Sequence, residues 1–384
     1  MTRTVAISNV ASTGFFAHNT ERSQTAWAAD ACIAVLRDSG LQATDIDGIC
    51  GGTPDALIMQ RALGIPELTW FANPAIIFGN ALIHSVAAVA SGLADVVLAY
   101  HGAYRSPWNT GAAARDPFRR GAGGGGGAGA PPPESIANAP AYTAWASRYL
   151  HEYGATRDHL GYVSMNARNR AAANPLAAMR SPITMADYHA APMVRWPLSR
   201  FDMDVAVDGA DAFVITTLER ARDLPHRPVI VDAVTLGVID RHVEDQAPGL
   251  AHHGQHIVAK SLRNRTDIRA GAADLFFPYD GFSIITLSWF ENFGYCGPGE
   301  AGSFIEQHRD PVTGIITIDG RVLVNPHGGS LGEGGTQGTG HVREAVMQLQ
   351  GRAGDRQAPD ARTALLGIGG FYFNSQGAAL RADD

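Results

Sequence analysis

The sequence predicts an α/β protein built from two similar halves. Apolar, strand-like runs alternate with helical patterns through all 384 residues, and this alternation is typical of layered α/β folds. A small-residue loop, a helix and an apolar strand follow one another at residues 79–100 and again at 334–368, which indicates an internal duplication. We therefore expect one half at residues 1–222, with a loop region at 102–150, and the other at 223–384.

The first half alternates short apolar strands with helices whose apolar side chains recur every three or four residues. Residues 21–39 show this helical spacing and end at Gly40, a residue type common at helix ends. The small-residue run at 79–94 predicts a helix that is buried on most faces. We expect strands at residues 4–8, 45–51 and 96–100 and a turn followed by a strand at 205–217. Helices are expected at residues 21–39 and 79–94, and the chain is expected to be helical again from residue 142 through 160–173.

The second half shows the same alternation and closes the predicted sheet. Residues 315–324 are expected to form a hairpin, because Asp319 and Gly320 are a turn-forming pair. A run of glycine and proline at 121–133 predicts a flexible surface loop, and no Lys-Ser or Lys-Thr pair follows it as a phosphate-binding loop would require. We expect strands at residues 228–237, 275–279, 364–370 and 378–380, and helices at residues 283–293 and 341–349.

Composition limits the class of protein. The net charge is −7, and no basic run has interleaved aromatics, which argues against a nucleic-acid partner. The three cysteines, Cys32, Cys50 and Cys296, are too few and too scattered for a disulfide framework or a zinc site, so we expect no metal and a cytoplasmic, reducing location. The chain has no apolar run of about 18 residues and no signal-peptide pattern, so we expect no membrane span.

Two neighbouring motifs in the second half carry the strongest functional signal. Residues 279–293, YDGFSIITLSWFENF, have the outline of a strand that ends in a polar tip and leads into a helix. Residues 324–346, VNPHGGSLGEGGTQGTGHVREAV, have the outline of a strand, a glycine-rich loop and a helix. Glycines let a backbone approach a ligand closely, and loops between rigid elements often hold active sites. The glycines of this loop are at positions 328, 329, 332, 334, 335, 338 and 340.

With these motifs the chain resembles the thiolase superfamily, and more closely the sterol carrier protein X thiolases and their lipid-transfer-protein relatives. The resemblance covers nearly the whole chain. It implies a duplicated, five-layer α-β-α-β-α fold, a homodimer, and a substrate that is an acyl-CoA thioester. The stretches that carry it are ASGLADVVLAY (90–100), EYGATRDHLGYVSMNARNRAAANPLAAMRSPIT (152–184), VDGADAFVITTLERA (207–221), YDGF (279–282), FGYCGPGEAGSFI (293–305) and NPHGG (325–329).

The residues that a thiolase needs for its chemistry are missing. The position of the nucleophilic cysteine falls near Ala75, and Tyr279 stands where a motif histidine would be. Gly-Gly-Thr at 334–336 replaces a second histidine motif, and residues 367–377 contain no cysteine. We therefore expect no acyl-enzyme on a cysteine.

The pattern is instead similar to the lipid-transfer-protein aldolases of steroid side-chain degradation. They share a Tyr-Asp-x-Phe tip, here at 279–282, and an Asn-x-x-Gly-Gly loop, here at 325–329. The resemblance implies retro-aldol cleavage of a β-hydroxyacyl-CoA to a ketone or aldehyde and a short acyl-CoA, together with a small OB-fold, zinc-ribbon partner protein. The chain departs from the pattern at Gly335, where such aldolases often have a tyrosine.

Retro-aldol cleavage needs a base for the β-hydroxyl proton and a group that stabilises the enolate on the thioester oxygen. Tyr279 is the predicted base or proton relay, and it needs a neighbouring donor or positive charge to act near neutral pH. His327 is the predicted neighbour and an alternative base. Asn325 and the backbone N–H groups around Gly328 and Gly329 are predicted to hold the enolate oxygen. We expect no cofactor other than the CoA of the substrate.

These residues also have structural interpretations. Tyr279 fits a core residue at a strand end, and His327 fits a structural loop histidine. His341 and Glu344 lie three residues apart on a predicted helix, which suits a metal or catalytic pair, although a polar pair packed on the loop is the simpler interpretation. Asp280 is expected to cap the helix at 283–293, since aspartate is a favoured N-cap residue.

Three functions fit these patterns. The favoured one is a lyase that acts on a CoA thioester without a cysteine nucleophile. The first alternative is a non-catalytic subunit of an acyltransferase complex in which another chain carries the nucleophile. The second is a protein that binds acyl-CoA or lipid without chemistry.

Overall fold

The computed structural model of the protein describes residues 3–18, 21–74, 78–106, 139–240, 249–372 and 374–384. Helices and strands alternate along these residues, as the sequence predicts. The glycine- and proline-rich run at 121–133 and the position of Ala75 lie outside the described residues, so the structure does not test the predictions made for them.

Five strands of the first half lie next to one another in the order β3-β2-β4-β7-β1. β2 is parallel to both β3 and β4, whereas β7 is antiparallel to β4 and β1. These strands are β1 (Val5–Ser12), β2 (Gly48–Gly51), β3 (Trp70–Ala72), β4 (Val96–Tyr104) and β7 (Asp208–Thr217).

Six strands of the second half follow in the order β8-β13-β12-β9-β11-β10. β9 is parallel to β11 on one side and to β12 on the other, so the three strands end at the same edge. These strands are β8 (Val229–Val238), β9 (Leu275–Pro278), β10 (Thr317–Ile318), β11 (Val322–Val324), β12 (Thr363–Phe371) and β13 (Asn374–Ala382).

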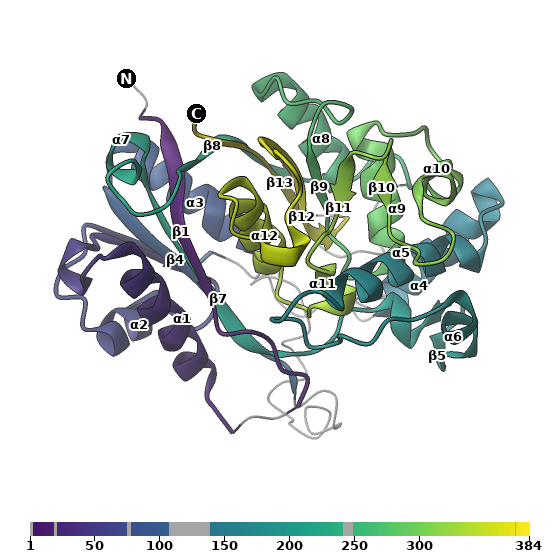
Figure 1. Ribbon diagram of the computed structural model, residues 1–384, viewed down its shortest axis with the longest axis horizontal. Coiled ribbons are helices and arrows are strands. Elements are labelled where there is room, and N and C mark those ends of the chain that lie inside the picture. The colour runs from purple at the N-terminus through teal and green to yellow at the C-terminus, as the bar shows by residue number, and fades with distance from the viewer. Residues whose placement is uncertain (1–2, 19–20, 75–77, 107–138, 241–248, 373) are drawn as a thin grey trace.

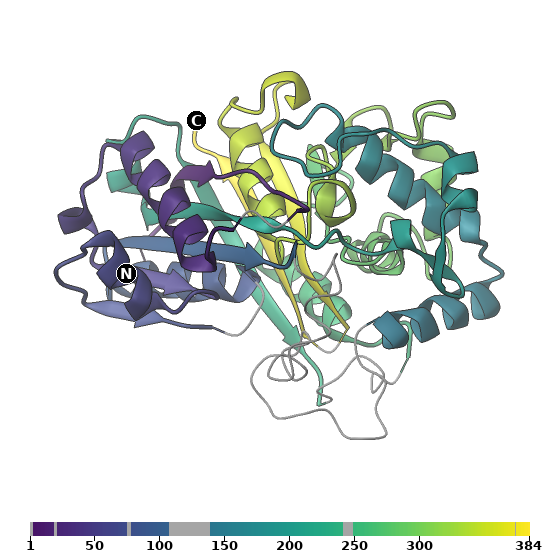
Figure 2. The same cartoon turned by 90° about the horizontal axis from the view of Figure 1, so that it is seen from below.

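The two blocks of strands meet where β1 pairs with β8 in antiparallel orientation, Ala6 opposite Ile230 and Ile7 opposite Val229. The described strands of both halves therefore form one eleven-stranded sheet, in which the purple-to-teal first half lies beside the green-to-yellow second half (Figures 1 and 2). The halves predicted at 1–222 and 223–384 each contribute one block, and the boundary itself stays a prediction.

Helix α1 shows how local signals set the ends of an element. Its N-cap is Ser23, whose hydroxyl accepts the N–H of Ala26, and it ends at Gly40, which has a left-handed φ of 74° that glycine adopts without strain. The helices are α1 (Gln24–Ser39), α2 (Ala56–Leu63), α3 (Phe78–Ser91), α4 (Ala139–Tyr153), α5 (Arg157–Ala171), α6 (Met185–Ala190), α7 (Leu218–Ala221), α8 (Gly254–Arg265), α9 (Ser283–Phe293), α10 (Ala301–His308), α11 (Gly329–Gly332) and α12 (Thr339–Leu349).

The buried side chains show how the helices and strands are layered. Successive strand residues face opposite sides of a sheet, so Ile49 packs with α1 and α2 while its neighbour Cys50 packs with α3. Helices α3 and α12 contact strands of both blocks and lie between them. On the outer side of the second block, Phe276 belongs to a buried cluster that also contains residues of α4, α5, α8, α9 and α10. The two blocks of strands are the two β layers, with helices between them and on both outer sides. The order of layers is therefore α-β-α-β-α, which confirms the predicted fold class.

Several strand predictions differ from the structure at their ends. The strands predicted at 4–8 and 378–380, for example, extend over Val5–Ser12 and Asn374–Ala382. The predicted strand at 45–51 was wrong at its start, because Ala43–Asp45 form a 3-10 turn and β2 begins only at Gly48. The predicted strand at 96–100 continues as β4 to Tyr104, which pairs with Asp208 of β7. In the described part of the chain, no helix combines the length and the apolar character needed to cross a bilayer.

Candidate active site

The candidate site lies at the edge where the parallel strands β9, β11 and β12 end. Leu275 of β9 stands opposite Leu323 of β11 and Ala364 of β12, so the loops that follow the three strands leave the sheet together. The carboxyl ends of parallel strands are a usual place for ligands in α/β proteins. Tyr279 follows β9 and Asn325 follows β11, and helices α11 and α12 lie beside this edge (Figure 1).

Tyr279 is held tightly between two glycines. A Cβ atom added at either Gly281 or Gly370 would come within 2.6 Å of Cε1 of the tyrosine ring, so both positions must lack a side chain. The side chain is largely buried, with 6% of the residue exposed. Burial raises the pKa of Tyr279 well above its usual range, with Asp204 acting in the same direction and Arg105 opposing it. The phenol is therefore neutral in the ligand-free site and needs a nearby positive charge to lose its proton.

Asp280 connects the tip of β9 to the glycine-rich loop. Its carboxylate accepts the N–H of Ser330 at 2.7 Å and that of Leu331 at 3.3 Å, and it lies 3.1 Å from Nε2 of His341. The prediction that Asp280 caps the helix at 283–293 was wrong. Helix α9 begins after Phe282, which provides no side-chain cap, and Asp280 instead holds the start of α11, about 50 residues later in the chain.

His327 is fully buried, and its ring packs against that of His341 with 4.7 Å between the ring centroids. Burial lowers the pKa of His327 well below its usual range, so the imidazole is neutral. Both ring nitrogens lack a hydrogen-bond partner among the described residues. His341 also packs against Tyr279, at 5.4 Å between centroids, so it contacts both predicted catalytic residues. The predicted role of His327 as a base stays a prediction.

Asn325, Gly328 and Gly329 shape the loop after β11. Asn325 has a left-handed φ of 44°, donates from Nδ2 to the carbonyl of Pro278 at 2.8 Å, and accepts the N–H of Gly328 at 2.9 Å. A Cβ at Gly328 would lie 2.6 Å from that of Ala171 in α5, and one at Gly329 would lie 2.0 Å from Oδ2 of Asp280. Close packing therefore accounts for both glycines. The predicted contact of these three residues with an enolate oxygen stays a prediction.

The sequence interpretation missed an ion pair beside Tyr279. Nη1 of Arg105 lies 2.6 Å from Oδ2 of Asp204, and Nη2 lies 3.1 Å from Oδ1, so the contact is bidentate. The available signal was position, since Arg105 follows the carboxyl end of β4 as Tyr279 follows that of β9. The predicted strand ended at residue 100, four residues before the end of β4, so this position was not recognised.

His341 and Glu344 do not act as the pair that their spacing suggests. His341 faces Asp280, whereas Glu344 is bound in a bidentate contact by Arg356 at 3.0 and 2.9 Å. Another buried arginine, Arg343, contacts Asp211 at 2.9 Å and also Glu333. Within the described ranges, no group of three or more His, Cys, Asp or Glu side chains is arranged to hold a metal ion.

The cysteines are poorly suited to nucleophilic chemistry. Cys32 and Cys50 are buried and Cys296 is partly buried, and all three are unpaired. Burial raises the pKa of Cys50 and that of Cys296 to about 12, so neither forms an appreciable thiolate at neutral pH.

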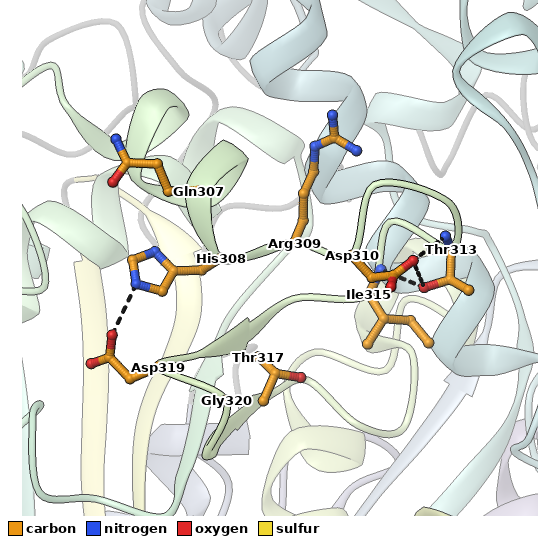
Figure 3. A pocket seen from close by; sticks show the side chains of 9 residues that line it. All are labelled: Gln307, His308, Arg309, Asp310, Thr313, Ile315, Thr317, Asp319 and Gly320. Carbon is orange, nitrogen blue, oxygen red and sulfur yellow. Dashed lines mark hydrogen bonds and ion pairs between the residues drawn. The ribbon is translucent and has the colours of Figure 1, made fainter.

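A surface hollow of about 600 Å³ lies away from these residues, between α10 and the β10–β11 hairpin (Figure 3). His308 and Asp319 face each other across it at 3.1 Å. Its walls contain none of the five predicted site residues; they are Gln307, His308, Arg309, Asp310, Thr313, Ile315, Thr317, Asp319 and Gly320.

Comparison with known proteins places this chain in a family. Residues 240–382 match the family described as Thiolase C-terminal domain-like. The chain is 34% identical to 17-hydroxy-3-oxo-4-pregnene-20-carboxyl-CoA lyase of Mycobacterium tuberculosis, over 88% of this chain and 89% of that protein. It is 33% identical to the steroid side-chain-cleaving aldolase of Thermomonospora curvata, over 98% of each chain.

The solved structure of an Ltp2-ChsH2(DUF35) aldolase superimposes with a TM-score of 0.83 at 29% identity, covering 99% of this chain and 98% of that one. These likenesses extend over both halves of the chain and include a common fold. They confirm the resemblance inferred from the motifs. The chain belongs to the steroid side-chain-cleaving aldolase branch of the thiolase superfamily.

Proposed function

We propose that the protein is a lyase that cleaves the side chain of a steroid β-hydroxyacyl-CoA by a retro-aldol reaction. Membership in the aldolase branch supports the reaction class. The observation that carries the proposal is the placement of Tyr279, a buried phenol clamped at a strand end beside Arg105, in a chain whose cysteines are protonated. This site is built to transfer protons and not to form a thioester with the protein.

The reaction balances without a cofactor. A base takes the proton of the β-hydroxyl, the bond between the α and β carbons breaks, and the β carbon becomes a carbonyl. The electron pair passes to the thioester as an enolate, which takes a proton at its α carbon. For the thioester in the name of the mycobacterial relative, the products are a 17-ketosteroid and propanoyl-CoA. CoA enters only as part of the substrate.

Tyr279 is the group we assign to the proton of the β-hydroxyl. It retains 6% exposure, whereas His327 is fully buried, so the phenol is the more accessible of the two predicted bases. The enolate oxygen would be held by donors of the loop after β11, for which Asn325, Gly328 and Gly329 are the candidates. Without substrate, the N–H of Gly328 donates to the carbonyl of Asn325 and Nδ2 of Asn325 donates to that of Pro278, so these two donors would have to be shared or released. His341 and Asp280 position the ring of Tyr279 and the loop relative to each other.

We further propose that the protein works with a DUF35-type partner of OB-fold and zinc-ribbon architecture, as a homodimer in the cytoplasm. The solved structure that covers nearly the whole chain is described as an Ltp2-ChsH2(DUF35) aldolase, a name that joins two proteins and supports a partner protein. The unpaired cysteines fit a reducing location.

The test is product release. The protein, alone and co-expressed with a DUF35 protein, is incubated with 17-hydroxy-3-oxo-4-pregnene-20-carboxyl-CoA, and propanoyl-CoA and the 17-ketosteroid are quantified by mass spectrometry. The proposal predicts equal amounts of both products. Binding of the thioester with no product under either condition would contradict it and would favour an acyl-CoA-binding protein.

A further inference from the structure

Arg105 and Asp204 form a largely buried ion pair next to the proposed catalytic phenol. Their side chains are 19% and 15% exposed, and their two contacts measure 2.6 and 3.1 Å. Burial alone would lower the pKa of Arg105, but Asp204 raises it above its usual range, so the guanidinium keeps its charge. A charged pair in this setting is costly to desolvate, which makes its position beside a functional residue informative.

The pair fills the space that a side chain at position 335 would take. A Cβ added to Gly335 would lie 2.2 Å from Nη1 of Arg105 and 2.2 Å from Oδ2 of Asp204. Nη1 of Arg105 also donates to the carbonyl of Gly335 at 3.1 Å. Only glycine fits at position 335 beside the ion pair, because any larger residue would displace the guanidinium.

Hydrogen bonds hold the backbone at both Arg105 and Asp204. The N–H of Arg105 donates to the carbonyl of Val207 at 3.0 Å and to Oδ1 of Asp208 at 2.8 Å. The N–H of Asp204 donates to the carbonyl of Gly281 at 3.0 Å. A Cβ at Gly281 would lie 3.0 Å from the hydroxyl of Tyr279, so the residue that anchors Asp204 is also the residue that flanks the phenol oxygen.

The segment that carries Asp204 also binds the glycine-rich loop. The N–H of Val205 donates to the carbonyl of Ser330 at 3.2 Å, and the N–H of Gly335 donates to the carbonyl of Val205 at 2.7 Å. The segment therefore connects the tip of β9 to the loop that contains α11. This geometry keeps the ion pair at a constant position relative to Tyr279.

We propose that the Arg105–Asp204 pair positions the charge that Tyr279 needs, with the guanidinium favouring the proton-accepting form of the phenol and the carboxylate holding the guanidinium in the space left by Gly335. This inference rests on the proposed function, since it assigns a role in the same proton transfer. It makes Arg105 and Asp204 positioning residues that act through Tyr279.

Arg105 and Asp204 have opposite effects on the pKa of Tyr279. Burial is the largest influence on the pKa of Tyr279; Asp204 and Asp280 raise it further, whereas Arg105 and the Ser330 hydroxyl lower it. His341, from α12, also packs against the ring. Loss of Arg105 should therefore raise the pKa of the phenol, and loss of the Asp204 charge should lower it.

The test is the pH dependence of kcat/KM for 17-hydroxy-3-oxo-4-pregnene-20-carboxyl-CoA. If Tyr279 is the base, kcat/KM rises with pH across the whole working range, because burial keeps the pKa of the phenol above that range. Arg105→Gln should move this rise upward by about one pH unit or more, with about a 10-fold loss at neutral pH, and Arg105→Lys should restore part of it. Asp204→Asn should move the rise downward. If Arg105 and Asp204 had only a structural role, their variants would not shift the pH profile in opposite directions.

The controls separate this inference from the proposed function. Arg321→Gln breaks an ion pair with Asp274 at the opposite end of β9 and should leave the profile unchanged. Gly335→Ala should shift the profile in the direction of Arg105→Gln, because the new methyl displaces the guanidinium. An active wild-type protein whose profile does not move in Arg105→Gln and Asp204→Asn overturns the role of the pair alone. An inactive wild-type protein overturns the proposed function, and the role of the pair with it.

Discussion

Nε2 of His341 lies 3.1 Å from Oδ1 of Asp280, and both side chains are 1% exposed. The same carboxylate accepts two backbone N–H groups of α11. One buried group thus holds together the tip of β9, the short helix α11 and the helix α12. The orientation of Tyr279, which precedes Asp280 and packs on His341, depends on this connection.

Removing the Asp280 carboxylate should therefore be costly. Asp280→Ala leaves two buried N–H groups and a buried histidine without their partner, and we expect a loss of roughly 3–5 kcal/mol in the free energy of unfolding. Asp280→Asn should cost less, because it keeps an acceptor. Denaturant unfolding measures both. Asp319→Ala is the exposed control, at 82% side-chain exposure, and a similar small effect in both alanine variants would refute the assignment.

Gly370 packs against the ring of Tyr279, so it should affect the rate although it takes no part in the reaction. Gly370→Ala would place a methyl 2.6 Å from Cε1 of the tyrosine ring and push the phenol out of position. We expect kcat to fall by about 10- to 100-fold, since small displacements of a reacting group are costly. Gly271→Ala is the matched control, because nothing lies within 4 Å of the added methyl. Equal kcat values in the two variants would show that the ring is not clamped.

Turnover should not depend on any cysteine side chain of the protein. Because burial raises the pKa of Cys296 to about 12, the thiol is not poised to attack a thioester at neutral pH. Cys296→Ala should retain turnover within about 2-fold, and iodoacetamide should not inactivate the native protein. A trapped acyl group on any cysteine, detected by intact-protein mass spectrometry during turnover, would contradict the mechanism.

Glu291 should give the stability a pH dependence outside the site. Burial raises the pKa of Glu291 from 4.5 to about 7, although hydrogen bonds from the Tyr149 hydroxyl and from the N–H of Gly299 lower it in part. Between these two pKa values, folded Glu291 keeps a proton that the unfolded chain has lost. The stability that neutral Glu291 contributes is therefore fully present below about pH 4.5 and is lost as pH rises through about 7.

Glu291→Gln removes this loss, because the amide stays neutral. The variant should be more stable than the wild type by roughly 1–2 kcal/mol at pH 8 and about equal to it at pH 4. Thermal unfolding at the two pH values measures the difference, with the exposed Glu67→Gln as control. A variant that is less stable than the wild type at pH 8 would show that folding does not raise the pKa of Glu291.

The layered fold was predictable from sequence because it depends on local patterns. Apolar periodicity gave the strands and most helices, and the repeat of loop, helix and strand indicated the duplication. The strand at 96–100 was too short because His101 and Gly102 break the apolar run, while hydrogen bonds to β7, distant in sequence, extend β4 to Tyr104. Arg105 was missed for the same reason.

The site was predictable only in part, because its contacts join segments far apart in the chain. Local preference assigned Asp280 to the nearest helix, but its partners Ser330 and His341 lie 50 and 61 residues away. The loop glycines suggested room for a ligand, yet at Gly328 and Gly329 the atoms that fill the space belong to Ala171 and Asp280. Only packing in three dimensions distinguishes a glycine that admits a ligand from one that admits a neighbour.

The most direct measurement is the effect of Tyr279→Phe on turnover and on binding. Turnover is followed as release of propanoyl-CoA from 17-hydroxy-3-oxo-4-pregnene-20-carboxyl-CoA. Binding is followed by calorimetry with 3-oxo-4-pregnene-20-carboxyl-CoA, which lacks the β-hydroxyl and cannot be cleaved. Tyr162→Phe, which removes another buried phenol bonded to Glu306 at 2.9 Å, is the control. We predict that Tyr279→Phe lowers kcat by about 100-fold or more with Kd unchanged; a kcat equal to that of Tyr162→Phe would contradict proton transfer by Tyr279.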